Sequence, residues 1–254
     1  MVALCWKNLL GTGGILTARL VVVLIIIIGF AITMLKSSAG SQETSQIVGM
    51  IVGFILVYSA LLGPQLLRTD LRSSLAQADV MKTFPLPGWQ IVFGEILSSA
   101  LLLAGFQWFM LLIGAGTMIC LPGRYESLML LISGSLLFML PVLDFLLLLV
   151  PNASVLLFPS WFTPGKSGPQ GIEATGQRLI MALAQLFAFL LALIPAGLIF
   201  CAVYFPLRYL FGSFVPIPFG ALAATLIFAL EAGVGIFLLG KVFEKLDLSE
   251  EQLN

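Results

Sequence analysis

Three acidic residues lie inside long apolar segments of this 254-residue chain: Glu95, Asp144 and Glu231. A charge deep in a bilayer costs at least ~2.5 kcal/mol, so such residues usually face a bundle interior and mark a function. They could carry protons, and Asp144 with Glu231 could form the acid pair of an intramembrane hydrolase. The segments that hold them contain no Lys or Arg. We therefore expect these acids to be protonated, hydrogen-bonded to groups such as Ser98 and Ser99, or placed in a wet cavity.

A structural role competes with a functional one at each acid. The helical rise puts Glu95 roughly 7 Å, Asp144 about 10 Å and Glu231 about 13 Å from the ends expected in the cytoplasm. The Glu95 side chain can then reach toward Lys82 or the lipid headgroups. Asp144 follows Pro141, which can kink a helix, by three residues. Asp144 and Glu231 are therefore the stronger candidates for polar groups with a role inside the bundle.

The chain otherwise has few of the residues that enzymes use for catalysis. The chain has no His, which removes the commonest general base and metal ligand. Its three cysteines, Cys5, Cys120 and Cys201, form no CxxC pair. We expect free thiols, although a disulfide between Cys120 and Cys201 is geometrically possible near the outer ends of their helices. No catalytic, cofactor-binding or metal site is predicted.

One short motif imitates a nucleotide site. Gly165-Lys166-Ser167 resembles the end of a phosphate-binding loop, but Ser160 stands where that loop needs its first Gly. A Pro on each side of the triplet also denies it the required strand and helix. We expect no ATPase motif in this chain.

Long apolar runs must position these residues. The chain is 60% hydrophobic and 9% charged, with a mean hydropathy of +1.11, whereas globular domains carry about 25% charged residues. Crossing a bilayer takes roughly 20 apolar residues as helix. The sequence predicts a single all-α, polytopic transmembrane bundle over residues 1–254. Its six spans are expected at about 14–35, 47–67, 91–120, 127–150, 179–205 and 217–240.

The basic residues outside the runs predict the orientation. Cytoplasmic loops carry an excess of Lys and Arg, and nine of the twelve basic residues fall on the side that holds the termini and the 68–90 and 151–178 loops. We therefore expect both termini in the cytoplasm. A cleaved signal peptide is the competing interpretation of the first span, but its apolar run is too long and Lys36 precedes the cleavage site it would need. A zero net charge argues against a nucleic-acid partner.

The 68–90 loop carries the densest polarity in the chain. Apolar residues recur at helical spacing between Arg68 and Phe84, and Pro85 and Pro87 end the pattern. This predicts a short amphipathic cytoplasmic helix with the apolar stripe Leu71, Leu75, Ala78 and Met81. The helix could lie flat on the inner leaflet, or it could dock a cytoplasmic partner through Arg72, Asp79 and Lys82.

Two further segments leave alternatives open. Pro206–Pro218 is apolar, aromatic and punctuated by Pro, which fits either a segment dipping into the membrane or a plain connector. Gly49, Gly53, Gly233 and Gly235 allow close helix approach, so packing is their expected role.

Several stretches carry a family resemblance. The region 68–95 contains R-x-D-L-R, D-V-M-K-T-F-P-L-P and I-V-F-G-E, and N-A-S-V-L-L-F-P-S-W, G-I-E-A-T-G-Q-R and F-E-K-L-D-L-S follow later. From about Trp6 to Leu248, the chain resembles the ABC-2 type transporter permeases, most of all the bacterial ABC exporter membrane proteins. None of these motifs is catalytic.

The resemblance implies six helices per subunit, a homodimer or heterodimer, and a separate cytoplasmic ABC ATPase at the bacterial inner membrane. The family's coupling helix maps onto Arg68–Phe84, its fold-back segment onto Pro206–Pro218, and its leading amphipathic helix onto Leu4–Leu16. The implied coupling residues are Arg68, Asp70, Leu71, Arg72, Leu75, Asp79 and Lys82.

The leading hypothesis is therefore the membrane subunit of an ABC exporter, embedded in the lipid bilayer and powered by ATP hydrolysed elsewhere. A proton-coupled secondary transporter that uses Asp144 and Glu231 is the first alternative. A non-transporting structural or sensor protein, or an intramembrane hydrolase, would be the others. The residues do not indicate a substrate.

Overall fold

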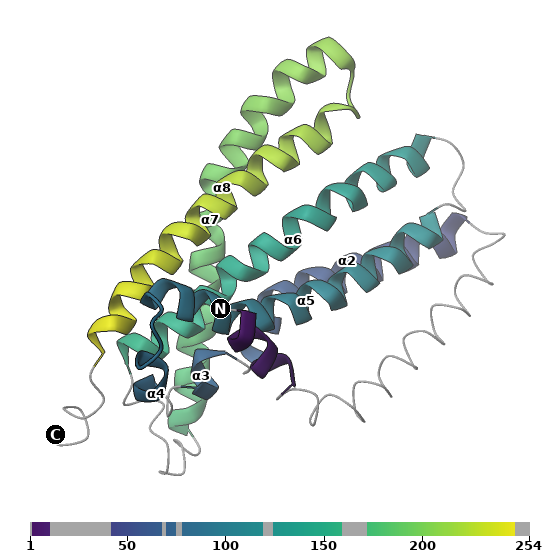
Figure 1. Ribbon diagram of the computed structural model, residues 1–254. Coiled ribbons are helices and arrows are strands. Elements are labelled where there is room, and N and C mark those ends of the chain that lie inside the picture. The colour runs from purple at the N-terminus through teal and green to yellow at the C-terminus, as the bar shows by residue number, and fades with distance from the viewer. Residues whose placement is uncertain are drawn as a thin grey trace.

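The computed structural model describes residues 2–10, 42–67, 70–74, 78–118, 124–158 and 172–246. These residues form helices and no strands, which confirms the all-α prediction (Figure 1). A helix at 2–10 is followed by α2 (Gln42–Leu66), α3 (Leu71–Ser74), α4 (Ala78–Lys82), α5 (Gly88–Met118), α6 (Arg124–Leu157), α7 (Ile172–Phe211) and α8 (Pro216–Lys245).

Five of these helices are long and apolar enough to cross a membrane. The candidate spans are Gln46–Gln65, Gly88–Gly116, Ser127–Leu157, Thr175–Phe211 and Pro216–Lys245. They coincide with the last five predicted spans, and such a set is that of a multi-pass integral membrane protein. The first predicted span, 14–35, lies outside the described residues and stays a prediction.

Pro does not end the helices at two predicted loops. Helix α6 continues through Pro151 to Leu157, and α7 already begins at Ile172, so both ends of the predicted 151–178 loop are helical. Val155 and Leu156 are buried, which favours continuing the helix past the proline. Apolar bundles tolerate Pro because neighbouring groups can satisfy the carbonyl that it frees.

The predicted connector Pro206–Pro218 is likewise a tight helical hairpin. Helix α7 passes through Pro206 to Phe211, and α8 begins at Pro216, a favourable residue for a first helical turn. Gly212 makes the turn with a φ of 83°, a left-handed conformation that suits Gly. Residues 206–218 are therefore mostly helix, with a short turn at Gly212 that joins α7 to α8.

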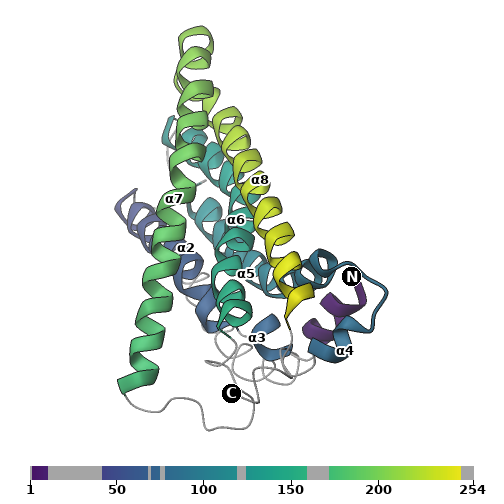
Figure 2. The ribbon, with the colours of Figure 1, turned by 90° about the vertical axis from the view of Figure 1, so that its left-hand side faces the viewer.

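The helices pack in the order α2, α5, α6, α8 and α7. Helices α7 and α8 run alongside each other near their shared turn and diverge toward the opposite end (Figure 2). That opposite end carries α3, α4 and helix 2–10, and is called the α3 end below. The largest cluster of buried apolar residues joins α5, α6 and α8 there, with Leu71, Ala78 and Met81 packed into it.

Helices α5 and α8 meet through two glycines at the α3 end. A Cβ on Gly240 would collide with the main chain of Trp89, and one on Gly88 would collide with the Gly240 carbonyl. The Glu244 carboxylate, from α8, accepts a 2.7 Å hydrogen bond from the Gly88 N–H, one of the free donors at the start of α5. Of the glycines predicted to allow close packing, Gly235 lies against the Leu149 side chain, whereas a Cβ on Gly53 or Gly233 would meet open space.

A proline in α6 is accommodated by a neighbouring helix. Pro141 has no N–H and leaves the Leu137 carbonyl, four residues earlier, without its usual helical donor. The Trp108 indole, from α5, donates a 2.9 Å hydrogen bond to that carbonyl. Trp108 and Pro141 therefore form a structural pair across the α5–α6 contact.

Candidate functional site

Glu95 is the centre of a buried polar cluster at the α3 end. Its side chain has no exposed surface. One carboxylate oxygen accepts hydrogen bonds from Asn8 Nδ2 and Ser74 Oγ, both at 2.7 Å, and the other lies 3.3 Å from Lys7 Nζ. Helix 2–10 and α3 are therefore both tied to α5 through one carboxylate.

The expected partner of the Glu95 carboxylate was wrong. Its cation is Lys7, which precedes it by 88 residues, and not Lys82 or a headgroup. The Lys82 amino group instead donates to the Leu246 carbonyl at the end of α8. The apolar run around Glu95 gave no sign of a partner so distant in sequence.

A second buried cluster fixes α3 to α6. Asp70 pairs with Arg72 at 2.7 Å, and their side chains are 0% and 8% exposed. Asn152, from α6, donates a 2.9 Å hydrogen bond to Asp70 and accepts a 3.1 Å bond from the Leu71 N–H. The Arg72 guanidinium also donates to the carbonyls of Pro64 and Leu67, at the end of α2. Asn152 escaped the sequence analysis because it was assigned to a loop.

The described part of the predicted amphipathic helix is α3 (Leu71–Ser74) and α4 (Ala78–Lys82). Asp70, Thr83 and Phe84 are not helical, so the helix is shorter at its ends than Arg68–Phe84. Leu71, Ala78 and Met81 are buried, as the apolar stripe predicted. Arg68 and Leu75 lie outside the described residues.

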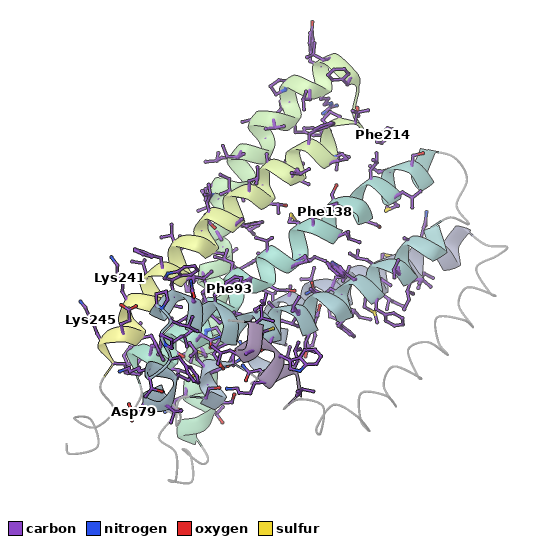
Figure 3. All side chains as sticks on the ribbon, in the orientation of Figure 1. Asp79, Phe93, Phe138, Phe214, Lys241 and Lys245 are labelled. Atoms are coloured by element: carbon purple, nitrogen blue, oxygen red, sulfur yellow. The ribbon has the colours of Figure 1, made fainter. Side chains whose placement is uncertain are left out.

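The polar side of this segment differs from the expectation. Arg72 and Lys82 were expected to be free for a partner, but both bind carbonyls of this chain. Asp79 is exposed, as are Val80 and Phe84, at 60% and 42%. Figure 3 shows Asp79 at the lower edge of the molecule, the α3 end, where Lys241 and Lys245 also lie on α8. Asp79, Val80 and Phe84 are therefore part of the exposed surface of this segment.

A third polar cluster lies deeper, between α2, α5 and α6. Asp144 and Gln107 both have no exposed surface. Gln107 Nε2 donates to Asp144 Oδ1 at 3.0 Å and to Ser59 Oγ at 3.3 Å, and Ser59 Oγ donates to the Leu56 carbonyl. Asp144 Oδ2 and Gln107 Oε1 are buried without a hydrogen-bond partner. Gln107 was overlooked because an uncharged residue does not interrupt an apolar run.

Among the described residues, Glu231 makes no hydrogen bond to this cluster. It is half-buried on α8, and its Oε2 atom is buried without a partner. Within the described ranges, no hydrogen bond joins it to Asp144. The acid pair that a hydrolase would need is therefore not formed by the residues that the structure describes.

A fourth polar contact joins α2 to α7. Gln65 Nε2 donates to Gln185 Oε1 at 3.2 Å. Gln185 is only 1% exposed, and its Nε2 group lacks a partner. Buried amides of this kind hold helices together where apolar side chains provide little direction.

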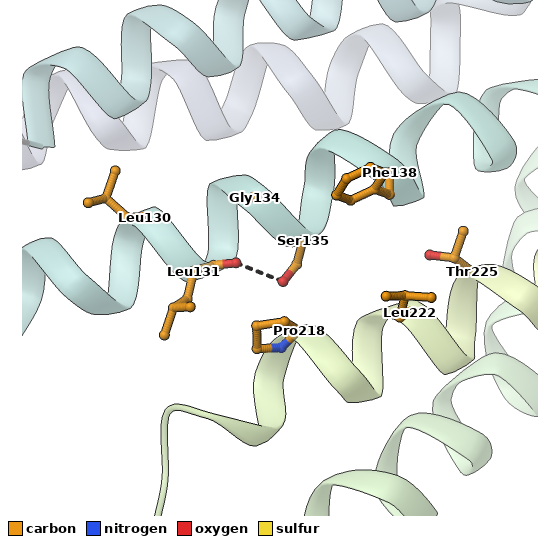
Figure 4. Close-up of a pocket in the computed structure, with 8 residues that line it drawn as sticks. All are labelled: Leu130, Leu131, Gly134, Ser135, Phe138, Pro218, Leu222 and Thr225. Atoms are coloured by element: carbon orange, nitrogen blue, oxygen red, sulfur yellow. Dashed lines mark hydrogen bonds between the residues drawn. The ribbon is translucent and has the colours of Figure 1, made fainter.

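An apolar groove lies between α6 and α8, away from the α3 end (Figure 4). Its volume is about 260 Å³, below the range usual for sites of drug-sized ligands. The hydroxyls of Ser135 and Thr225 donate to carbonyls of their own helices, so the groove offers no free hydroxyl donor. The lining residues are Leu130, Leu131, Gly134, Ser135, Phe138, Pro218, Leu222 and Thr225.

The two described cysteines, Cys5 and Cys201, are both free thiols. Cys5 is buried in helix 2–10, and burial raises the pKa of its thiol, with a smaller contribution from the negative charge of Glu95. A raised pKa lowers the thiolate fraction, so the thiol is a weak nucleophile at neutral pH. Cys201 is free and exposed on α7, whereas Cys120 lies outside the described residues.

Comparisons with known proteins gave no match to a family model, a curated protein or a solved structure. The described polar groups of this chain form two buried clusters that hold short helices at one end of an apolar bundle, one buried carboxyl–amide cluster within it, and the Gln65–Gln185 contact between α2 and α7.

Proposed function

We propose that this protein is the membrane subunit of an ABC-2 type exporter in the bacterial cytoplasmic membrane. It moves a substrate with ATP hydrolysed by a separate nucleotide-binding subunit, and works as a homodimer or heterodimer. The proposal includes six spans with both termini in the cytoplasm. The order of sequence motifs supports it, and so does the way in which α3 and α4 are mounted on the bundle.

The mounting of α3 and α4 is the observation that carries the proposal. Leu71, Ala78 and Met81 are buried in the core cluster that joins α5, α6 and α8. Asp70 is hydrogen-bonded to Asn152 of α6, and Ser74 to Glu95 of α5. A displacement of α3 is therefore transmitted directly to the candidate spans α5 and α6. This is what a subunit without its own ATPase needs in order to receive a motion from a partner.

The exposed side of the same segment supplies the contact surface. Asp79, Val80 and Phe84 combine one charge with two large apolar side chains. Interfaces place most of their binding energy in a few such residues, with apolar and aromatic anchors at the centre. An ATPase groove that receives Val80 and Phe84 and pairs a basic residue with Asp79 would be complementary to this surface.

The test changes the chemistry of this surface and leaves in place the buried residues that hold α3 and α4 on the bundle. Asp79→Lys with Val80→Glu should leave the protein inserted and folded, because both side chains are exposed. We expect at least a tenfold loss of affinity for the ATPase in co-purification, and loss of substrate-stimulated ATP turnover. The control is Ser213→Lys with Val215→Glu, which introduces the same two side chains at exposed positions of the α7–α8 turn. Wild-type ATPase binding and coupling in the Asp79/Val80 variant would overturn the proposal.

A proton-coupled secondary transporter is the second candidate, and the burial of Asp144 favours it. An ionisable group without a countercharge inside a bundle is a common element of proton pathways. The two candidates differ in their energy source. Transport by the purified chain alone, driven by a proton gradient and abolished by Asp144→Asn, would replace the ABC assignment.

A further inference from the structure

The unpartnered atoms at Gln107 and Asp144 are both hydrogen-bond acceptors. One is the Asp144 Oδ2 atom and the other is the Gln107 Oε1 atom. They belong to two side chains already joined by a 3.0 Å bond between Gln107 Nε2 and Asp144 Oδ1. Buried polar atoms in proteins are nearly always hydrogen-bonded. Two unpartnered acceptors on joined side chains therefore indicate that a hydrogen lies between them.

The donors around this cluster are already used. The two hydrogens of the Gln107 amide point to Asp144 Oδ1 and Ser59 Oγ, and the Ser59 hydroxyl donates to Leu56 O. The ion pairs formed by the described residues are Lys7–Glu95 and Asp70–Arg72, so none of them neutralises Asp144. A carboxylate here would be an uncompensated charge in a segment that crosses the membrane.

We propose that Gln107 and Asp144 form a binding site for a single proton, held as a carboxylic acid–amide pair. The proton lies on Asp144 Oδ2 and is donated to Gln107 Oε1, while Gln107 Nε2 donates to Asp144 Oδ1. One hydrogen thus removes the charge and provides both unpartnered acceptors with a hydrogen bond. The site is independent of ATP coupling, so it can exist whether or not the chain is an ABC subunit.

The number of free oxygens favours a proton over a metal ion. Hard cations such as Mg²⁺ and Ca²⁺ take six or more oxygen ligands, and this cluster offers two acceptors without a partner. The described residues also contain no group of three acidic or cysteine side chains that could hold a metal. A proton needs only one donor position and one acceptor.

Infrared spectroscopy of the full chain in lipid nanodiscs tests the proposal directly. A protonated carboxyl absorbs as a C=O stretch well separated from a carboxylate, and carboxyl-¹³C aspartate shifts that band but not those of glutamate. We expect one aspartic acid band that Asp144→Asn removes and Glu231→Gln leaves in place. Gln107→Leu should shift the band to higher frequency, because the acid loses its amide partner. Replacing Na⁺ by choline should change nothing.

Each alternative outcome is decisive. An aspartate carboxylate band that Asp144→Asn removes would show that the site is ionised and overturn the proposal. Loss of the acid band in Na⁺ would assign the site to a metal ion instead. Asp144→Asn preserves the pair, since two amides can make the same two hydrogen bonds, so we expect it to fold. If it does not fold, the Gln107→Leu frequency shift still tests the pair in a protein with its carboxyl intact.

Discussion

At the scale of the residue, two glycines on one helix have opposite surroundings. Gly240 lies against the main chain of Trp89, whereas a Cβ on Gly233 would meet open space. The sequence alone cannot distinguish them, because both are small residues in an apolar run. The distinction arises from where α5 begins and from which face of α8 it touches.

Gly240→Ala should therefore destabilise the bundle, while Gly233→Ala should not. The added methyl group at Gly240 forces α5 and α8 apart, and overpacking of this kind typically costs about 1–3 kcal/mol. Alanine at Gly233 should be neutral or stabilising by up to about 1 kcal/mol, because it favours helix. Unfolding of both variants in detergent by far-UV circular dichroism measures the difference. Equal stabilities would show that α5 and α8 do not touch at these glycines.

At the scale of the element, the described part of α3 is a single turn, Leu71–Ser74, and short helices are marginal by themselves. Its position depends on Asp70 and Asn152, which join it to α6 over 82 positions of sequence. A helix of this length is ordered by its tertiary contacts, not by the propensity of its own residues. The buried polar cluster is therefore what makes the segment a rigid part of the bundle.

Removing this cluster should release α3 at a predictable energetic cost. Asp70→Ala leaves the Arg72 guanidinium buried without its carboxylate, and breaking such a pair costs about 3–5 kcal/mol. Asn152→Ala leaves the Leu71 N–H without its acceptor and should cost about 1–3 kcal/mol. Asp79→Ala, on the exposed side, should stay within about 0.5 kcal/mol. Limited proteolysis between α3 and α4, together with thermal unfolding, measures the release of α3 from α6. An Asn152→Ala protein as stable as the Asp79→Ala protein would contradict this account.

The sequence predicted the spans well and their polar contacts poorly. Spans follow from local composition, since any helix in hydrocarbon needs a long apolar run, and five predicted spans coincide with α2, α5, α6, α7 and α8. Partners such as Lys7 for Glu95 depend on how helices pack, which no local pattern encodes. Nothing in the sequence marked Gln107 except that it is polar. Pro151 and Pro206 suggested helix ends, but the helices continue through both residues.

At the scale of the whole molecule, the order of the spans places two accessible positions on opposite faces of the membrane. Ser73 precedes α5, and Gly212 lies between α7 and α8, with three candidate spans separating them. In cells, Gly212→Cys should react with a membrane-impermeant maleimide, and Ser73→Cys only after permeabilisation. The excess of basic residues beside Ser73 predicts that this side is cytoplasmic. Labelling of both positions from the same side would break the proposed topology.

The bond between Trp108 and the Leu137 carbonyl has a consequence for biogenesis. A lone α6 that enters the bilayer exposes the carbonyl freed by Pro141 to lipid, which penalises its insertion. Helix α5 precedes α6 along the chain and brings the indole that covers this carbonyl. Insertion of the two helices as a hairpin would therefore avoid this penalty. The carbonyl freed in α6 thus makes the insertion of that helix depend on the presence of α5.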